Sequence, residues 1–319
     1  MACFLVTGGA GFMGSHLVDA LLKQGHLVRV LDDLSSGCRE NLPQQIQFLR
    51  GDVTNPAAVE DALEGVDGCF HLAAIASVAR SNSEWRRTHE VNLTGTINVF
   101  DRARRLRDHR AVPVVYASSA AIYGDCAAIP IGEDAPVAPL SAYGADKSAC
   151  ELHARVAGTV HRIPTVGLRF FNLYGPRQDA RSPYSGVIAR FASRLRLGDS
   201  VKIFGDGKQV RDFTYVGDAV TALCCALNAA STDAPVFNVC TGKGTTVRVL
   251  AETMAELYHV DLVAHYRPPR PGEVRVSLGN PRRAAQKLGF TAETTLADGL
   301  ASTLALPSCP VELEPQTVA

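Results

Sequence analysis

The stretch Gly8-Gly9-Ala10-Gly11-Phe12-Met13-Gly14 constrains the fold of this chain more than any other part of its sequence. It follows an apolar run at residues 3–7, which is typical of a strand buried on both faces, and it precedes a helical pattern at residues 15–22. Glycines between a strand and a helix permit a tight turn, and the N-terminus of the helix can then face a pyrophosphate. The stretch therefore predicts a dinucleotide-binding turn.

A second apolar run, at residues 26–31, ends in Asp32 and Asp33. A glycine pattern alone could mark only a turn, but an acid at the end of the second strand can accept hydrogen bonds from a ribose diol. Asp32 stands ~20 residues beyond the glycines, which is the spacing that this role requires. Because a 2′-phosphate would meet these carboxylates, the sequence favours NAD over NADP.

Strand and helix patterns continue to alternate along the chain. Further strands are predicted at residues 47–53, 68–74, 112–119 and 165–171, and long helices at residues 84–107 and 142–160. Repeated strand–helix units imply a parallel sheet with right-handed crossovers. Ligands of such open α/β sheets bind at the carboxyl ends of the strands. Ser119 falls at one of these ends, where it is either a ligand of the substrate or an ordinary turn serine.

Tyr143 and Lys147 are four residues apart on the first turns of a predicted helix, so they share one helical face. A free phenol titrates near pH ~10 and is a poor base at neutrality. A neighbouring ammonium favours the phenolate, which makes a tyrosine a better general acid or base. Alone, the pair also fits an ordinary amphipathic helix with a surface lysine.

The charge and cysteine content narrow the possible partners. Lys+Arg and Asp+Glu both total 32, so the formal net charge is zero and no nucleic-acid partner is expected. The nine cysteines show no metal-ligand spacing, which predicts reduced thiols and no metal site. No signal peptide and no membrane-spanning segment are evident. We expect a soluble, cytoplasmic protein with no membrane partner.

Four motifs follow one another in order: Thr-Gly-Gly-Ala-Gly-Phe-Met-Gly at residues 7–14, Ser118-Ser119, Tyr143 with Lys147, and Arg-Phe-Phe-Asn-Leu-Tyr-Gly-Pro-Arg at residues 169–177. Together they resemble the extended short-chain dehydrogenase/reductase family, specifically its nucleotide-sugar epimerase/dehydratase branch, over nearly the whole chain. The resemblance implies an α/β fold with a Rossmann-like doubly wound parallel sheet and a smaller C-terminal α/β substrate-binding domain. It also implies a catalytic triad of Ser119, Tyr143 and Lys147, with Lys147 also holding the nicotinamide ribose.

The resemblance assigns further residues to an NAD site and to a nucleotide-sugar site. The implied cofactor-binding residues are Gly8, Gly11, Phe12, Met13, Gly14, Asp32, Asp33, Ser35, Ser36, Gly37, Asp52, Val53, Leu72, Ala73, Ala74, Asn92, Tyr143, Lys147 and Phe170. The implied substrate-binding residues are Ser77, Arg80, Ser119, Tyr143, Asn172, Val187, Lys202, Phe204, Arg211, Arg270, Glu273 and Ser277. In these assignments Asn172, Arg211 and Arg270 bind phosphate and Phe204 stacks on the base. Ser277 leaves room beside the sugar for a 2-acetamido group.

The resemblance also suggests how the chain divides. We expect an NAD-binding domain at residues 1–168 that carries the catalytic residues. A mainly sugar-nucleotide-binding domain at 169–306 would return some segments to the first, and residues 307–319 would form a flexible tail. The helices at 84–107 and 142–160 correspond to those that pair across homodimers in related proteins. Packing against the chain's own sheet explains their apolar faces equally well.

The residues after Ser119 bear on the reaction. In 4,6-dehydratases of the branch an Asp and a Glu occupy the two positions that are Ala120 and Ala121 here. A methyl group cannot move a proton, so the stretch is more similar to that of UDP-hexose 4-epimerases, in which NAD is regenerated in each cycle. UDP-glucuronate is a competing substrate, for an epimerase or a decarboxylase, and Arg80, Arg177 and Arg181 are the candidate partners of its carboxylate. A dehydratase or reductase of a different sugar nucleotide also fits the family, whereas the retained triad disfavours a non-catalytic NAD sensor.

Overall fold

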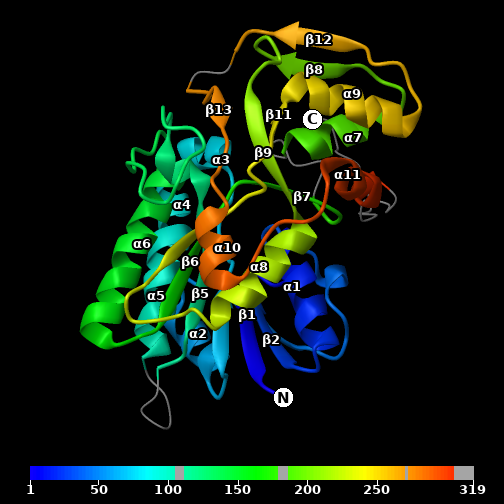
Figure 1. The fold of residues 1–319 in the computed structure, drawn as a ribbon. Coiled ribbons are helices and arrows are strands. Elements are labelled where there is room, and N and C mark those ends of the chain that lie inside the picture. The colour runs from blue at the N-terminus through cyan, green and yellow to red at the C-terminus, as the bar shows by residue number, and fades with distance from the viewer. Residues whose placement is uncertain (105–110, 179–185, 270–271, 305–319) are drawn as a thin grey trace, which may run out of the picture.

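A seven-stranded parallel sheet forms the larger part of the molecule. The computed structural model describes residues 1–104, 111–178, 186–269 and 272–304. The strand order is β10-β6-β5-β4-β1-β2-β3, so the order reverses between β1 and β4 (Figure 1). A ligand of such a sheet binds beside the reversal, at the carboxyl ends of the strands. The strands are β1 (Cys3–Thr7), β2 (Leu27–Asp32), β3 (Gln47–Arg50), β4 (Gly68–His71), β5 (Val114–Ser119), β6 (Thr165–Phe170) and β10 (Val236–Val239).

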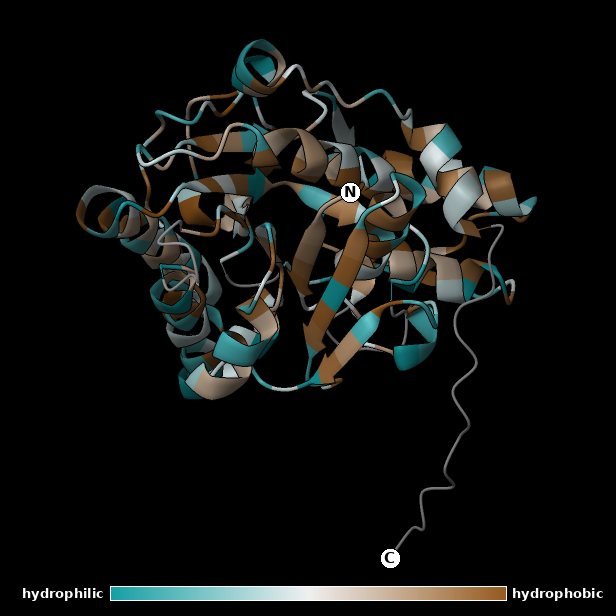
Figure 2. Cartoon of the chain, turned by 90° about the horizontal axis from the view of Figure 1, so that it is seen from below, coloured by the Kyte–Doolittle hydropathy of each residue, from teal (hydrophilic) through white to brown (hydrophobic). Residues whose placement is uncertain are grey.

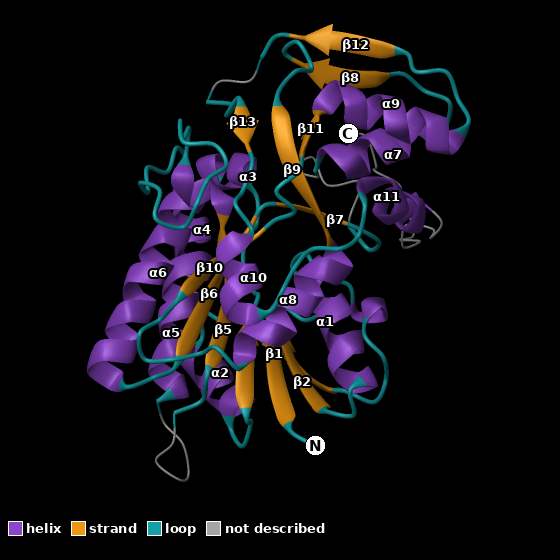
Figure 3. Ribbon diagram, viewed as in Figure 1, coloured by secondary structure: helices purple, strands orange, loops and turns teal. Residues whose placement is uncertain are grey.

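Helices cover both faces of this sheet, as Figure 3 shows. On one face α1 (Phe12–Lys23), α8 (Val216–Leu227) and α10 (Arg282–Leu288) pack on side chains such as Phe4 and Val6. On the other face α2 (Pro56–Leu63), α5 (Gly95–Ala103) and α6 (Ala142–His161) pack on Leu5, Cys69 and Val114. Successive side chains of β1 thus enter opposite cores. This arrangement confirms the predicted doubly wound α/β fold.

The helix predicted at residues 84–107 is a single helical run with an irregular centre. It consists of α4 (Trp85–His89), a π-helical turn η2 (Glu90–Thr94) and α5, and the last residues of the predicted range lie outside the described part of the chain. The helix predicted at 142–160 is α6, whose first turn is capped where Ser141 Oγ accepts the Gly144 N–H at 3.1 Å. The strands predicted at 47–53 and 68–74 end earlier, at Arg50 and His71, because the chain leaves the ladder there.

A smaller part sits over the carboxyl edge of the large sheet. Its strands β7 (Asn172–Tyr174), β9 (Val210–Tyr215), β11 (Gly244–Thr246) and β13 (Val276–Ser277) form one sheet, and β8 (Val201–Phe204) pairs with β12 (Ala264–Arg267). The helices α7 (Val187–Leu195), α9 (Val247–Tyr258) and α11 (Leu296–Leu304) complete a separate apolar core. Between these elements the chain returns β10, α8 and α10 to the large sheet.

The hydropathy of the chain follows these layers. Figure 2 shows the strands of the large sheet mainly in hydrophobic colours and the hydrophilic residues mainly on the outer surfaces of the helices. Within the described residues no helix combines the length and the apolar character needed to cross a bilayer. The stretch predicted to be a flexible tail, residues 307–319, lies outside the described residues.

Candidate active site

The glycine turn joins β1 to α1 and is too crowded for side chains. Gly8 has φ of +69°, and a Cβ built on it would lie 2.7 Å from the backbone of Ala73, which follows β4. A Cβ on Gly14 would collide with the carbonyl oxygen of Gly8. Helix α1 begins at Phe12, so its unpaired first N–H groups lie at the edge of the sheet. The turn is therefore built to bring backbone close to an anionic ligand.

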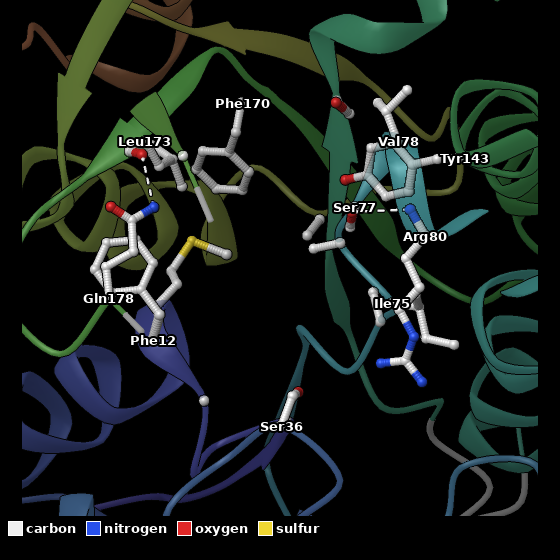
Figure 4. Close-up of a pocket in the computed structure, with 18 of the residues that line it drawn as sticks. Phe12, Ser36, Ile75, Ser77, Val78, Arg80, Tyr143, Phe170, Leu173 and Gln178 are labelled. Atoms are coloured by element: carbon white, nitrogen blue, oxygen red, sulfur yellow. Dashed lines mark hydrogen bonds between the residues drawn. The ribbon is translucent and has the colours of Figure 1, made fainter. Parts of the chain in front are cut away.

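A cavity of about 1830 Å³ runs along the carboxyl edge of the sheet and continues into the smaller part. Figure 4 shows Tyr143 beside Ser77 and Val78, across this cavity from Phe170 and Leu173. Most residues that the sequence assigned to a site line it. They are Gly8, Gly11, Phe12, Met13, Gly14, Asp32, Asp33, Ser35, Ser36, Gly37, Asp52, Val53, Leu72, Ala73, Ala74, Ser77, Arg80, Ser119, Tyr143, Lys147, Phe170, Asn172, Val187, Lys202, Phe204, Arg211 and Glu273.

Two of the assigned residues that the structure describes do not line the cavity. Asn92 is buried in the π-helical turn, where its amide accepts the Ile75 N–H at 2.8 Å and donates to the Ile75 carbonyl at 3.2 Å. It therefore shapes the loop after β4 instead of lining the cavity. Ser277 lies in β13, paired with Arg211 of β9, and does not line the cavity either. Arg270 lies outside the described residues.

The carboxylate of Asp32 closes the turn at the end of β2. Its Oδ2 accepts the Ala10 N–H at 2.9 Å and its Oδ1 accepts the Leu34 N–H at 2.8 Å. Burial raises the pKa of Asp32, and the two backbone donors act against that rise. Each carboxylate oxygen keeps a second lone pair that a ribose hydroxyl can use. Asp33 is held by Ser35, whose backbone N–H and hydroxyl both donate to its Oδ1.

Asp52, after β3, has a partner that the sequence did not reveal. Arg87 Nη2 donates to its Oδ2 at 2.7 Å, and the Thr54 N–H donates to its Oδ1 at 2.8 Å. Burial alone would raise the pKa of Asp52, but these partners hold it below its usual value. Arg87 also lines the cavity. No spacing in the sequence links Arg87 of helix α4 to the end of β3.

Ser119, Tyr143 and Lys147 all line the cavity at the carboxyl edge of the sheet. Ser119 ends β5, and its Oγ accepts the Ala121 N–H at 3.1 Å at the start of the short helix η3 (Ala120–Tyr123). Tyr143 is the second residue of α6, and Lys147 follows one turn later. The Nζ of Lys147, which is buried, lies 5.9 Å from the centroid of the Tyr143 ring. A hydroxyl from β5, and a phenol and an ammonium from α6, therefore line the same cavity.

His71 lies at the end of β4 and is hydrogen-bonded through both ring nitrogens. The sequence did not predict a structural role for it. Its Nε2 lies 3.0 Å from the Thr96 hydroxyl and its Nδ1 lies 2.8 Å from the Thr7 hydroxyl. Thr96 donates its own proton to the Asn92 carbonyl at 2.6 Å, so Nε2 must carry the hydrogen and Nδ1 must accept. Burial lowers the pKa of His71 to about 3, and the charge of Lys147 acts in the same direction. The imidazole is therefore neutral and holds the two threonines in place by hydrogen bonds.

Thr7 links His71 to the cavity wall through hydrogen bonds. Its Oγ accepts the backbone N–H groups of Leu72 and Ala73 at 3.2 and 3.3 Å. Both residues line the cavity, and Ala73 packs directly against Gly8. His71 stands within an apolar run in the sequence, and nothing in its spacing indicates the two threonines. The sheet register pairs Thr7 with His71, and the packing of helix α5 on the sheet brings Thr96 to the other ring nitrogen.

The far end of the cavity belongs to the smaller part. Lys202 and Phe204 come from β8, and Arg211 comes from β9. Arg211 Nη2 lies 3.4 Å from Glu273 Oε1, and its Nη1 donates to the Val210 carbonyl at 2.8 Å. Val187 begins α7, and so places the N-terminus of that helix on the wall. An aromatic ring, two cations and a helix N-terminus suit a nucleoside diphosphate.

The residues present fit an extended dinucleotide. The acids Asp32 and Asp33 follow β2, whereas Ser119 follows β5, three strands away. Three strand spacings amount to about 14 Å, which a dinucleotide lying across the edge of the sheet can bridge. The glycine turn lies between these two ends, where the pyrophosphate would lie. In the described ranges, no cluster of three or more His, Cys, Asp or Glu side chains is arranged to hold a metal ion.

Comparisons with known proteins agree with this geometry. A model described as the NAD dependent epimerase/dehydratase family matches residues 4–240. The UDP-glucose 4-epimerase of Mycolicibacterium smegmatis is 37% identical over 311 residues, which cover 94% of this chain and 96% of that protein. The structure of the Thermotoga maritima UDP-glucose 4-epimerase with UDP-glucose has a TM-score of 0.89 at 37% identity and covers 95% of this chain and 97% of that one.

A second solved structure has the same overall similarity. It is the UDP-N-acetylglucosamine 4-epimerase from Methanobrevibacter ruminantium in complex with UDP-N-acetylmuramic acid. Its TM-score is 0.89 at 34% identity, and the match covers 95% of this chain and 97% of that one.

Proposed function

The chain belongs to the NAD dependent epimerase/dehydratase family, and we propose that it inverts C4 of a UDP-hexose through a transient 4-keto sugar. NAD bound along this edge of the sheet would supply the reversible hydride chemistry at C4. Tyr143 takes the proton of the C4 hydroxyl, and Lys147 holds the nicotinamide ribose. Ser119 hydrogen-bonds the sugar oxygen. After the keto sugar turns within the cavity, Tyr143 returns the proton on the other face.

The distribution of carboxylates along the cavity carries this proposal. Elimination of water would need an acid and a base beside Ser119, where the chain has Ala120 and Ala121. Of the acids that line the described cavity, four belong to the β2 and β3 end, namely Asp32, Asp33, Glu40 and Asp52. The other two are paired, Glu84 with Arg80 and Glu273 with Arg211. Among the described residues, this leaves Tyr143 as the group for proton transfer at C4 and leaves no unpaired carboxylate beside Ser119 for an elimination.

The charge partners of the candidate arginines favour a neutral hexose over UDP-glucuronate. Arg80 Nε lies 2.9 Å from Glu84 Oε2, and Arg177 Nη2 lies 2.9 Å from Asp19 Oδ2. A sugar carboxylate would have to displace these acids to reach either guanidinium. The third candidate, Arg181, lies outside the described residues. The choice of uridine rests on the relatives, which are UDP-sugar epimerases.

An N-acetylhexosamine nucleotide is the second candidate substrate. The structural neighbour from Methanobrevibacter ruminantium is a UDP-N-acetylglucosamine 4-epimerase. The sequence argument for this substrate used the small side chain of Ser277, which does not line the described cavity. Turnover of UDP-GlcNAc compared with UDP-Glc therefore has to decide the question.

We also propose that the protein is a homodimer joined through α6 and α4. Leu152, Val156 and Val160 recur every four residues along α6 and are 54%, 48% and 64% exposed. Trp85 of the adjacent helix α4 is also exposed. A continuous apolar stripe of this kind suits the same stripe on a second copy. For location we propose the cytoplasm, in keeping with the free state of the eight cysteines that the structure describes.

The reaction is tested with purified protein and no added NAD. Incubation with UDP-Glc, UDP-GlcNAc and UDP-GlcA is followed by NMR for the configuration at C4 and by mass spectrometry for the product mass. A 4-epimer of unchanged mass is the expected product. Loss of water or of carbon dioxide would instead identify a dehydratase or a decarboxylase.

A further inference from the structure

The catalytic residues come from two elements, and the contacts that hold these elements together lie one turn below the cavity. Ser119 belongs to β5, whereas Tyr143 and Lys147 belong to α6. Glu151 lies four residues after Lys147, so it continues the same face of the helix towards the sheet. We propose that the buried ion pair between Glu151 and Arg169 is a positioning device that fixes the catalytic helix against Ser119. This inference rests on the proposed function of the triad.

The ion pair is bidentate and buried. Arg169 of β6 donates from Nε to Glu151 Oε1 at 2.9 Å and from Nη2 to Glu151 Oε2 at 2.7 Å. The side chains of Arg169 and Glu151 are only 5% and 11% exposed. Ser118, the neighbour of Ser119, donates its hydroxyl to Glu151 Oε1 at 2.6 Å. One carboxylate of α6 therefore receives donors from both β5 and β6.

The remaining nitrogen of the Arg169 guanidinium, Nη1, extends the network to residues that follow Ser119 in the chain. Arg169 Nη1 donates to the Tyr123 hydroxyl at 2.7 Å and to the Glu133 carbonyl at 2.8 Å. Tyr123 is the last residue of η3, the short helix that begins directly after Ser119. Its hydroxyl donates to Asn238 Oδ1 of β10 at 2.7 Å. All three guanidinium nitrogens are thus engaged, and the network joins α6 to three strands and η3.

This geometry is sensitive to small displacements of the helix. Two parallel N–H···O bonds fix both the height of α6 and its rotation relative to the strands, because a slide or a turn would break at least one of them. Ser118 precedes Ser119, and Phe170, which lines the cavity, follows Arg169. A shift at the ion pair would therefore appear as a shift between the phenol of Tyr143 and the hydroxyl of Ser119.

A positioning role can be separated from a purely structural one. Removing one partner of a buried ion pair leaves an uncompensated charge, but replacing both partners with neutral residues of similar volume is often harmless to stability. The informative protein is thus the double variant Glu151→Gln with Arg169→Met. The control is Glu60→Gln with Arg102→Met, which removes a more exposed ion pair of 3.0 Å between α2 and α5 on the same face of the sheet.

The experiment compares the melting temperature, kcat and KM of the two double variants and of the wild type, all as the full chain. We expect the Glu151/Arg169 variant to melt within about 5 °C of the wild type. Its kcat should fall about 100-fold, the effect expected of a misplacement of about 1 Å, while KM hardly changes. The control should keep the wild-type kcat. A wild-type kcat in the Glu151/Arg169 variant, or an equal loss in the control, would overturn the proposal.

A double-mutant cycle with Ser119→Ala adds a measurement that a structural role would not change. If the ion pair acts by aligning α6 with Ser119, its removal should cost less than about 10-fold once the Ser119 hydroxyl is gone. A cost that remains about 100-fold in that background would show that the two sites act independently, contrary to the proposal.

Hydrogen–deuterium exchange provides a readout that does not depend on turnover. In the Glu151/Arg169 variant, the amides of residues 117–123 and 141–152 should exchange about 10-fold faster than in the wild type, while the rest of the sheet is unchanged. Unchanged exchange in both segments would contradict the proposal. If the wild type forms no 4-epimer but this local loosening is present, the proposed function fails and the positioning device stands.

Discussion

The ammonium of Lys147 lies 5.9 Å from the centroid of the Tyr143 ring, one helical turn further along α6. Both residues line the cavity at the carboxyl edge of the sheet. In the reaction proposed above, the phenol transfers the proton and the lysine holds the nicotinamide ribose. The two side chains then have separable roles, because only the phenol hydroxyl would move a proton.

Tyr143→Phe should therefore remove catalysis and spare cofactor binding. We expect kcat to fall by about 10³-fold, within the range of a lost general acid/base, because the ring remains but the proton-transferring oxygen is gone. The NAD that copurifies, measured after release by heat, should match that of the wild type. A variant that turns over at the wild-type rate would show that another group takes the C4 proton.

Asp33→Ser should weaken the preference for NAD over NADP. In the structure Asp33 lines the cavity beside Asp32, so its charge lies where a 2′-phosphate would be. Loss of one carboxylate should lower the ratio of NADP to NAD dissociation constants by about 10-fold, as measured by calorimetry on protein stripped of cofactor. Asp33→Glu, which keeps the charge, is the control. An equal drop in both variants would assign the effect to the fold of the turn.

Because of His71, the free energy of unfolding should fall as the solution becomes more acidic. Its folded pKa of about 3 lies below the ordinary value, so between about pH 6.5 and 3 the unfolded chain binds a proton that the native state does not. The free energy of unfolding then falls as the pH drops through this window, by about 2 kcal/mol between pH 6.5 and 5. Urea denaturation of the wild type and of His71→Gln at both pH values isolates the effect. The pH dependence of the variant should be smaller by that amount, and identical slopes would contradict the assignment.

Leu152→Asp should convert the proposed dimer into a monomer. A charge in the α6 stripe cannot be buried against a second copy without a large desolvation cost. Light scattering after gel filtration measures the mass directly. Leu197→Asp is the matched control, because Leu197 is 74% exposed and follows α7 in the smaller part. Equal masses for the wild type and Leu152→Asp would exclude this surface as the interface.

The sequence predicted the features that depend on local pattern. The glycine turn, Asp32 at the end of β2 and the Tyr143–Lys147 spacing each follow from residues close together in the chain, and the structure places them on one cavity. The resemblance supplied the residues of the smaller part, most of which also line that cavity. Asn92, assigned to the cofactor site by the resemblance, lies in a π-helical turn with its amide bonded to Ile75, and that contact was not predictable from the sequence.

Contacts between distant elements could not be predicted. His71 meets Thr96 across 25 residues, and Arg87 meets Asp52 across 35. Glu151 and Arg169 are closer in sequence, but their contact depends on the way α6 packs against β6. Polar contacts of this kind show no periodicity, because they depend on how separate elements pack together and not on the period of either element.

The most direct test of the account is the fate of the hydrogen at C4. UDP-galactose deuterated at C4 is incubated with the purified protein without added NAD, and the product is examined by NMR and mass spectrometry. The account predicts UDP-glucose of unchanged mass with deuterium still at C4, since the hydride leaves and returns within one active site. Loss of the deuterium to solvent, or a product lighter by water, would contradict it.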